Sequence, residues 1–562
     1  MLQRLTSTLR TKLHPTGPGA MRLELIAALT LFAIGLPEAV GYSAIAHMPI
    51  AAGVATMTLP MLAYALVGSS RHLVVGADSA TAAILAAGLS SLALPASERY
   101  VALCMVSVLF TASILFASRI FRLGFIASFL SRTLLVGFMI GVGISVAVGQ
   151  LPKMLGLPAL HTHGTLAGAW AICTHLGQVS WISLAFAAGA LAVLLATKRF
   201  EKIPVAFGLI AVAMVATLVF HLKDRGLAVV GAAHFSLPSY ALPHLSSSSI
   251  GSLLTLAASM AIVILAQSAA TSQAYAARYD ESYDANADLI GLGVANLAAA
   301  ALGAFVVSGS LTKTEIADSA GSRSQLGPLF AALFSTVALF TLLGPLAYLP
   351  EAVLAAVVFS IALRLMRFAD LRQILRLRRD EGIVAIITAL AVITLGVQNG
   401  IIASAVLCLI NHVRRGYEPK NYLLAQEDGA WQPHPVADLT PLRPGIFCYR
   451  FEASLYYANV SKFASEVALL STQPGTAEII CDLSAIADID YSAGQALNQL
   501  TSRLATRSVT LTLTHATEQV TAQLSRFKVT AHDHVRLLTN TKAALANPPS
   551  TATTASTATS QS

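Results

Sequence analysis

The sequence predicts a polytopic α-helical membrane protein that is followed by a small α/β domain. Of its 562 residues, 55% are hydrophobic and only 11% are charged, whereas soluble domains carry about 25% charged residues. Up to residue 413, apolar runs follow one another at lengths of roughly 15 to 22 residues, and a helical span needs about 20. After residue 421 charged residues and prolines return, and short strand and helix patterns alternate.

Fourteen apolar segments divide into two sets of seven. The first set lies near 23–40, 50–69, 78–94, 98–118, 131–150, 180–197 and 203–221; the second lies near 250–271, 287–307, 311–322, 325–347, 350–363, 382–397 and 399–413. Because seven is odd, the second set begins on the opposite side of the membrane from the first. Two halves of this kind indicate an inverted repeat, over about 21–221 and 250–413.

Basic residues orient these segments. The N-terminal residues 1–20, the six arginines of 364–379 and the pair Arg414 and Arg415 flank apolar runs, and such residues stay in the cytoplasm. We therefore expect a multi-pass protein of the plasma or inner membrane with both termini cytoplasmic. A cleaved signal peptide is not expected, because no small-residue cleavage site precedes a soluble domain.

Several function classes find no support in the sequence. The net charge of +8 indicates cytoplasmic loops rather than nucleic-acid binding. The five cysteines are scattered, without metal-ligand spacing. HExxH, Walker A and nucleophile-elbow motifs are absent. We expect no enzyme activity, no metal and no cofactor.

The third segment of each half has the features from which we predict a binding site. One begins at "VVGADSATAAI" and the other at "VVSGSLTKTEIADSAG", residues 306–321. Each has a β-branched run, a glycine break and small polar residues, which is typical of a short helix that starts inside the membrane. Such a start leaves backbone N–H groups unpaired and carries partial positive charge. Two facing starts would make a site for an anion.

Four stretches resemble the sulfate permease (SulP) family of anion transporters. "GSSRHLVVGADSATAAI" (68–84) is similar to its signature, "GLPEAVGYSAIAHMPIAAG" (35–53) to its first segment and "GSLTKTEIADSAGSRSQL" to its tenth. "CDLSAIADIDYSAGQAL" resembles the STAS domain that the family carries. The resemblance spans about residues 20–545 and implies inverted repeats, a gate domain that moves against a core domain, and a homodimer.

The resemblance also implies that the substrate lies between the third and tenth segments. The candidate substrate-binding residues are Asp78, Ser79, Ala80, Ser310, Thr312, Lys313 and Gln267, and the candidates for proton coupling are Glu38 and Asp78. Gln267 stands where many members have an acid, and in the bicarbonate branch that acid helps to bind sodium. Its identity therefore argues against a sodium-coupled bicarbonate carrier of that type.

Each of these residues has an alternative structural role. Asp78 could be only a helix N-cap, Lys313 could form an ion pair with Asp78 or Glu315, and Glu38 could make a helix-end contact. Ionisable groups inside a membrane are expensive to bury and favour functional roles. An ionised Asp78 would repel an anion, so either Lys313 neutralises it or it takes up a proton when the anion binds.

The C-terminal region is expected to comprise a linker (414–442), a cytoplasmic STAS domain (443–547) and a disordered tail (548–562). Strands are expected in "GIFCYRFEASLYYAN", "AEIICDL" and "SVTLTLTHA", and helices in "VSKFASEVALLS" and after "DID". Ser492 matches by position the serine that is phosphorylated in soluble STAS proteins, although its neighbours depart from that motif; an ordinary helix start is the alternative.

The function that the sequence favours is secondary active transport of a small anion, sulfate or a related inorganic or carboxylate anion. Both proton coupling and uncoupled exchange stay open. The alternatives are an anion channel, a neutral-solute carrier of the same architecture, and a membrane-anchored STAS signalling protein. Lys313 favours an anion over a neutral solute, and the intact set of transport motifs argues against a purely signalling role.

Overall fold

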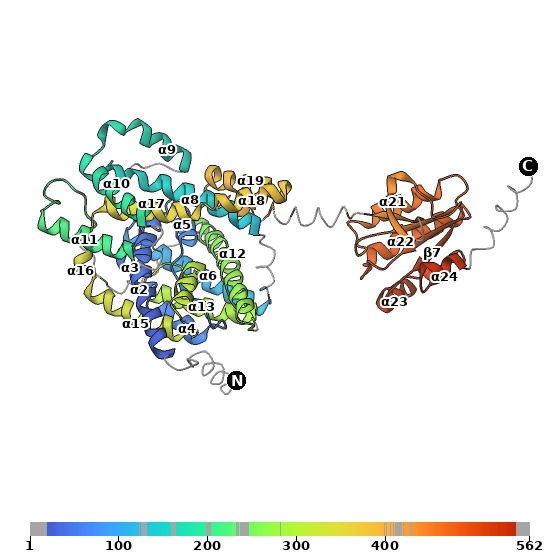
Figure 1. Ribbon diagram of the computed structural model, residues 1–562, viewed down its shortest axis with the longest axis horizontal. Helices are drawn as coiled ribbons and strands as arrows, with labels where there is room; N and C mark the ends of the chain where they lie inside the picture. The colour runs from blue at the N-terminus through green and yellow to red at the C-terminus, as the bar shows by residue number, and fades with distance from the viewer. Residues whose placement is uncertain are drawn as a thin grey trace, which may run out of the picture. The chain divides into compact units, whose positions relative to one another are not determined.

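The computed structural model describes residues 20–546, with internal gaps of which the longest are 236–246 and 411–418. The expected N-terminal segment before residue 20 and the tail 548–562 lie outside the described residues, and the last expected span, 399–413, lies partly outside them. The chain divides into two compact units, Met1–Cys408 and Leu409–Ser562 (Figure 1).

The first half of the helical unit follows the expected segments. Its helices are α2 (Ala20–Ile45), α3 (Ile50–Ala55), α4 (Leu59–Val67), α5 (Ser79–Leu89), α6 (Glu98–Ile120), α8 (Arg132–Leu155), α9 (Thr165–Thr174), α10 (Trp181–Ala196) and α11 (Val205–Val219). The expected second span is divided into α3 and α4, and Pro60 occupies the first turn of α4, where a missing N–H costs nothing.

The second half also combines long helices with short ones. It contains α12 (Ser247–Arg278), α13 (Ala285–Ala301), α14 (Leu311–Ser319), α15 (Leu326–Thr341), α16 (Leu343–Leu346), α17 (Glu351–Leu365), α18 (Phe368–Leu377) and α19 (Arg379–Leu395). The short helix α18, which carries part of the basic cluster, lies between α17 and α19 and has no buried residues.

The helix lengths match a bilayer only in part. Among the described residues, six helical stretches are long and apolar enough to cross a membrane, and they include α2, α6 and α12. The third segment of each half is too short: α5 has 11 residues and α14 has 9, whereas a span needs about 20. These two are the half-helices that the glycine breaks predicted.

Packing divides the helical unit into two bundles. We call α2–α6 with α12–α15 the core bundle, because α13 packs on α4 and α6, α12 on α5 and α6, and α15 on α2. We call α8, α10, α11, α17 and α19 the gate bundle, in which α8 packs on α17 and α19. Each bundle combines helices from both halves of the sequence, as interlocked repeats require.

The second unit is a six-stranded sheet with helices. Its elements are β3 (Tyr422–Glu427), β4 (Ala430–Pro435), β5 (Ile446–Arg450), α21 (Val460–Ser471), β6 (Glu478–Asp482), α22 (Tyr491–Ala505), β7 (Thr510–Thr514), α23 (Glu518–Arg526), β8 (Val535–Leu538) and α24 (Thr541–Ala546). The strand order is β4-β3-β5-β6-β7-β8, with β5 to β8 parallel. Apolar residues of α21, α22 and α23 share one core with the sheet, and α24 contributes to a smaller core with Cys448 and Ile480.

One expectation about this unit was wrong. The stretch from 414 to 442 was expected to be a linker, but it contains both β3 and β4, which pair antiparallel from Tyr422↔Pro435 to Glu427↔Ala430. The physical reason for the error is that β4 is an edge strand: its side chains are mostly exposed and it carries prolines, which edge strands tolerate. The sheet therefore begins at Tyr422.

Candidate functional site

The two half-helices start from a pair of short strands that lie side by side. β1 (Val75–Gly76) pairs antiparallel with β2 (Ser308–Gly309), in the register Val75↔Gly309 and Gly76↔Ser308. The Ser310 amide also donates to the Val74 carbonyl at 3.0 Å. The lead-ins were expected to be extended backbone, and they satisfy one another's hydrogen bonds. This pairing brings the N-termini of α5 and α14 together.

Asp78 is the N-cap of α5. Its carboxylate accepts hydrogen bonds from the amides of Ala80 at 3.0 Å and Thr81 at 3.4 Å. We expected the amides of this turn to face an anion, but in this structure the Asp78 carboxylate occupies them. It therefore stands in for an anion at the helix start. The side chain of Gln267, from α12, interacts with the same carboxylate.

The start of α14 is capped by Ser310. The Ser310 hydroxyl accepts from the Lys313 amide at 3.3 Å and lies 3.1 Å from the Thr312 hydroxyl. Thr312 is exposed, whereas Ser310 and Lys313 are buried. The expected residues of α14 are thus together at one helix start, with Thr312 at its accessible edge.

Lys313 pairs with Glu38, which neither of the expected ion pairs included. Its Nζ lies 3.4 Å from Glu38 Oε2, donates to the Ala77 carbonyl at 2.9 Å and lies 4.9 Å from the centre of the Tyr42 ring. Lys313 is fully buried, and Glu38 Oε2 accepts no hydrogen bond among the described residues. The ammonium is thus held by a carboxylate, a carbonyl and a ring face, all from the first repeat.

Other buried polar side chains fix the lead-ins across the two repeats. The Thr314 hydroxyl accepts from the Val74 amide at 3.0 Å, and Gln325 donates to the Leu73 carbonyl at 3.0 Å. Asn296 bonds both the N–H and the C=O of Val307, at 3.0 and 2.9 Å. Sequence reasoning missed these residues, although a polar side chain within an apolar segment, such as Asn296, is a signal that could have found them.

Arg71 and His72 precede β1 and lie beside Glu281, which follows α12. The nearest oxygens of Glu281 lie 3.6 Å from Arg71 Nη1 and 3.4 Å from His72 Nε2. The His72 ring stacks on Tyr279 with 4.5 Å between ring centres.

In the second unit, Ser492 is exposed in the first turn of α22, where Asp490 accepts from the Ala493 amide at 2.7 Å.

Comparison with known sequences agrees with this architecture. Residues 21–388 match the model of the sulfate permease family, and residues 439–542 match that of the STAS domain. A probable sulfate transporter of Mycobacterium tuberculosis is 32% identical over 511 residues, which cover 90% of this chain and 91% of the relative. Sulfate transporter 2.1 of Arabidopsis thaliana is 24% identical over 539 residues, 90% of this chain and 79% of the relative.

Solved structures share the fold. The structure of murine Solute Carrier 26 family member A9, an anion transporter in the inward-facing state, matches with a TM-score of 0.87 at 20% identity, over 96% of this chain and 93% of that one. The transmembrane domain of a cyanobacterial bicarbonate transporter matches with a TM-score of 0.61 at 18% identity, over 72% of this chain and 99% of that one. By its sequence matches and its two-unit fold, the chain belongs to the sulfate permease family, whose members are membrane transporters and not enzymes, and it ends in a STAS domain.

Proposed function

We propose that the protein is a secondary active transporter of sulfate, or of a closely related inorganic or carboxylate anion, across the cytoplasmic membrane. The observation that carries the proposal is the fully buried Lys313 at the start of a half-helix, beside a second half-helix start. A fixed cation and two helix N-termini together favour an anion over a neutral solute. The name of the Mycobacterium tuberculosis relative, a probable sulfate transporter, supports sulfate as the first anion to test.

The charges around this position favour coupling to protons. Glu38 and Asp78 both carry carboxyl groups near Lys313, so with all three groups ionised the cluster holds one negative charge in excess. An anion that approaches Lys313 must compete with these carboxylates. A proton on one of them removes the competition, because it neutralises one negative charge where solvent cannot screen it. Glu38 and Asp78 are therefore the proposed proton carriers.

The proposed substrate position lies at the start of α5 and α14, and Ser79, Ala80, Ser310, Thr312 and Gln267 complete it. Binding of the anion at the α5 start requires the Asp78 side chain to leave the amides of Ala80 and Thr81. Protonation of Asp78 weakens its hold on those amides, since a neutral carboxyl accepts hydrogen bonds less strongly than a carboxylate. Proton uptake and exposure of the anion site are thus linked through one side chain.

Transport would then move the core bundle relative to the gate bundle. Gln267 of α12 and Met139 of α8 meet at the boundary between the two bundles, where the Gln267 amide nitrogen lies 3.9 Å from the Met139 sulfur. This is a weak contact. This contact breaks at little expense when one bundle slides past the other.

Uptake into proteoliposomes tests the proposal. Labelled sulfate, bicarbonate, chloride and a dicarboxylate should be compared with and without an imposed pH gradient. We expect sulfate to accumulate when the outside is acidic and to stop accumulating when a protonophore is added. If uptake requires an anion on the opposite side of the membrane, the protein is an antiporter and not a proton-coupled transporter. Current without accumulation would identify a channel.

The same proposal includes an orientation. We propose that both termini, and with them the STAS domain, lie in the cytoplasm, and the basic residues that flank the apolar segments support this orientation. Protease added to sealed, right-side-out cells should leave the connection between the two units intact. Cleavage between residues 411 and 421 under those conditions would overturn the orientation.

A further inference from the structure

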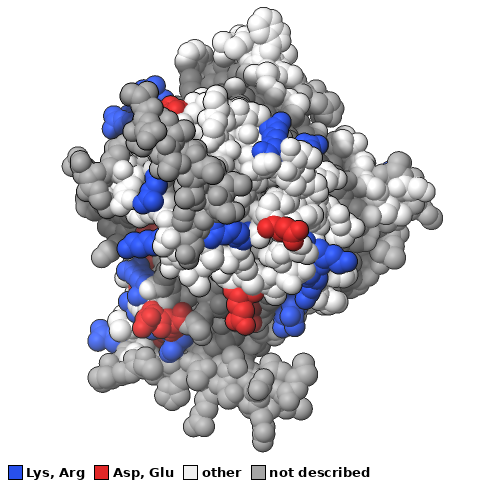
Figure 2. Space-filling view, turned by 90° about the vertical axis from the view of Figure 1, so that its right-hand side faces the viewer, with Lys and Arg blue, Asp and Glu red and all other residues white. Residues whose placement is uncertain are grey.

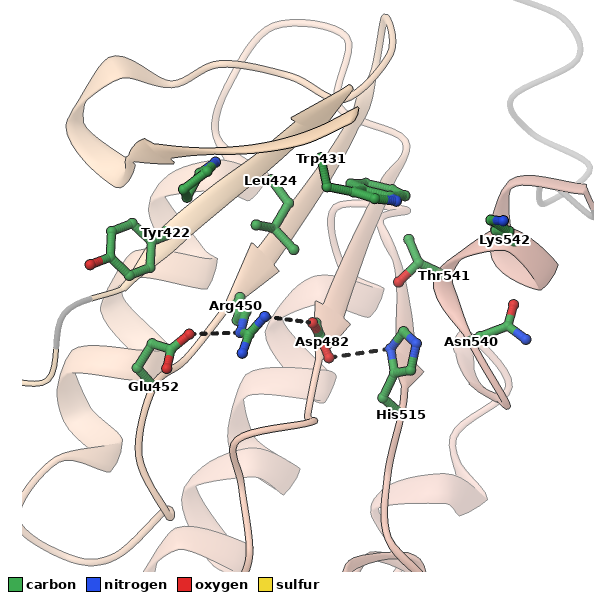
Figure 3. A pocket seen from close by; sticks show the side chains of 11 residues that line it. Tyr422, Leu424, Trp431, Arg450, Glu452, Asp482, His515, Asn540, Thr541 and Lys542 are labelled. Atoms are coloured by element: carbon green, nitrogen blue, oxygen red, sulfur yellow. Dashed lines mark ion pairs between the residues drawn. The ribbon is translucent and has the colours of Figure 1, made fainter. Parts of the chain in front are cut away.

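The second unit contains an open groove at one edge of its sheet. The cavity measures about 1060 Å³ and lies between the β3–β4 hairpin and α24 (Figure 3). Arg450, Asp482 and His515 form its floor, at or just after the carboxyl ends of the parallel strands β5, β6 and β7. Ligands of α/β sheets bind at this end of the strands. The volume suits a drug-sized molecule, since ligand pockets measure roughly 300 to 1,000 Å³.

The two acids of the groove floor, Glu452 and Asp482, each lie beside a basic side chain. Arg450 Nε lies 2.7 Å from Glu452, and Arg450 Nη1 lies 4.0 Å from Asp482. His515 Nδ1 lies 3.2 Å from the other Asp482 oxygen. These pairs form a continuous row from Glu452 to His515 along the floor (Figure 3). Each acid of the floor therefore lies within 4.0 Å of an arginine or histidine nitrogen.

Lys542 supplies a positive charge at the end of the groove beyond His515. It is exposed on α24 and forms no ion pair with an acid among the residues that the structure describes. Asn540 and Thr541 lie beside it on the same wall and add hydrogen-bonding groups (Figure 3). This end of the groove is therefore suited to an anionic group.

Trp431 supplies a flat apolar surface on the facing wall. It belongs to the edge strand β4 and is 37% exposed. Its ring extends over the groove on the side of Thr541 and Lys542 (Figure 3). A solvent-exposed tryptophan that faces a cavity is a stacking platform for a planar ring. Leu424 of β3 extends the apolar wall.

We infer that this groove binds a small molecule that joins a planar ring to an anionic group. The ring stacks on Trp431, and the anionic group lies between Lys542 and His515, where Asn540 and Thr541 reach it. The site belongs to the second unit alone. It is therefore independent of the proposed transport site, and its test does not depend on transport.

Tryptophan fluorescence of the full-length protein tests the inference. The chain has three tryptophans, Trp170, Trp181 and Trp431, so a Trp170→Phe/Trp181→Phe background isolates the signal of Trp431. The probe is 4-nitrobenzoate, a ring with a carboxylate that quenches tryptophan. The controls are 4-nitrobenzamide, which has the same ring without the charge, and acetate, which has the charge without the ring. We expect saturable quenching by 4-nitrobenzoate and at least ten-fold weaker binding of both controls.

A matched pair of lysine variants locates the anionic group. Lys542→Gln should weaken 4-nitrobenzoate binding about ten-fold, the usual effect of losing a charge-assisted contact. Lys528→Gln, in the same unit but outside the groove, should leave the affinity unchanged. Absence of saturable quenching, equal affinity for 4-nitrobenzamide, or an unchanged affinity in Lys542→Gln would each overturn the inference. Calorimetric titration of the same variants reports binding if a substitution alters the Trp431 signal itself.

Discussion

Lys313 is held so closely that its charge is not freely available. The buried ammonium has Glu38, the Ala77 carbonyl and the Tyr42 ring around it. Removing one member of a buried ion pair leaves the other uncompensated, which destabilises a protein by about 3–5 kcal/mol. A single substitution at this position therefore mixes a binding effect with a folding effect, and the two must be separated.

The double variant Lys313→Ala/Glu38→Gln makes this separation, because it removes both charges. We expect it to fold and to raise the half-saturation concentration for the anion at least ten-fold, since the fixed positive charge at the half-helix start is lost. Uptake kinetics measure the effect, and thermal unfolding in detergent checks the fold. Glu38→Gln alone leaves the Lys313 ammonium without its acid, so its thermal unfolding reports the cost of breaking the pair. A well-folded double variant with the normal half-saturation concentration would exclude Lys313 from the substrate site.

Asp78→Asn separates capping from titration. Asparagine caps helices about as well as aspartate, so α5 should keep its start at Ser79 and the protein its stability. If Asp78 carries a proton during transport, the variant should show an uptake rate that no longer depends on pH. The measurement is uptake at several outside pH values. The wild-type pH profile in the Asn variant would leave Asp78 as a helix cap without a further role.

At the residue scale, the sequence predicted which residues gather at the site but not how they pair. The glycine breaks and small polar residues identified Asp78, Ser310 and Lys313, because a helix start has a local signature. The partner of Lys313 was missed, because Glu38 is far away in the chain and nothing local indicates which acid a lysine will meet. The occupation of the Ala80 and Thr81 amides by Asp78 was predicted as an alternative, and the structure has it.

The paired strands β1 and β2 are the element on which the site depends. Gly309 leaves no room for a side chain: an added Cβ would lie 2.8 Å from the Leu73 side chain and 2.8 Å from the Ser268 hydroxyl. The same hydroxyl accepts the Gly309 N–H at 2.9 Å. A methyl group at this position must displace the end of the Leu73 side chain and the Ser268 hydroxyl that accepts the Gly309 N–H.

Gly309→Ala should therefore displace the start of α14 by a few tenths of an ångström and reduce the maximal uptake rate several-fold, because misplacement of catalytic or binding groups is expensive. Gly251→Ala in α12 is the matched control, since an added Cβ there meets nothing within 4 Å. Uptake and membrane expression should be measured for both. Equal uptake by the two variants would show that the tight fit at β2 has no part in transport.

The strands of the second unit contain a buried acid with a pH effect of its own. Burial raises the pKa of Glu478 on β6, while the hydrogen bond from Thr512 and the Arg536 guanidinium at 3.6 Å lower it. A carboxyl whose pKa is raised by folding binds its proton more tightly in the folded state. The stability from this group is therefore present at low pH and is lost as the pH rises through the folded pKa.

Glu478→Gln should remove this dependence. We expect the amides of β6 and β7 to be protected better at pH 5 than at pH 7.5 in the wild type, after correction for intrinsic exchange, and equally at both pH values in the variant. Hydrogen exchange of the full-length protein measures the protection. Glu518→Gln, at an exposed position of α23, should keep the wild-type difference. A variant that keeps that difference as well would assign the pH effect to another group.

At the element scale, prediction succeeded where the pattern was strong and local. Val509, Leu511 and Leu513 alternate and indeed share the core with α21, α22 and α23. The strand pair expected in 445–459 was only half found: β5 ends at Arg450, and beyond it Leu455 forms an isolated bridge with Ile489. β1 and β2 are two residues long, too short for any periodicity, so their pairing could not be predicted.

For the whole molecule, composition was sufficient to predict a polytopic membrane protein. Charged residues are 11% of the chain. On the face shown in Figure 2, acidic and basic side chains are scattered among uncharged ones, and several lie side by side. The division into bundles was not predictable from composition, because each bundle joins helices from both repeats. The division into a core and a gate was expected only from the family resemblance, and the packing of α12 on α5 and α6 supports it.

The pairing of β1 with β2 determines which covalent cross-links transport can tolerate. Two backbone strands from different repeats share their hydrogen bonds, so the half-helices cannot separate without leaving buried peptide groups unpaired. The two half-helices must therefore move together as one part of the core bundle. A covalent cross-link within the core bundle should leave transport intact, whereas a cross-link between the core bundle and the gate bundle should block it.

Two pairs of engineered cysteines make this distinction measurable. Arg71→Cys/Glu281→Cys lies within the core bundle, where the native side chains approach to 3.6 Å, and Met139→Cys/Gln267→Cys spans the boundary between core and gate. After treatment with a bridging thiol reagent, the first pair should keep its uptake rate and the second should lose it, each relative to the untreated variant. The paired strands would then be a rigid element of the transporter, which keeps its shape while the core bundle moves relative to the gate bundle.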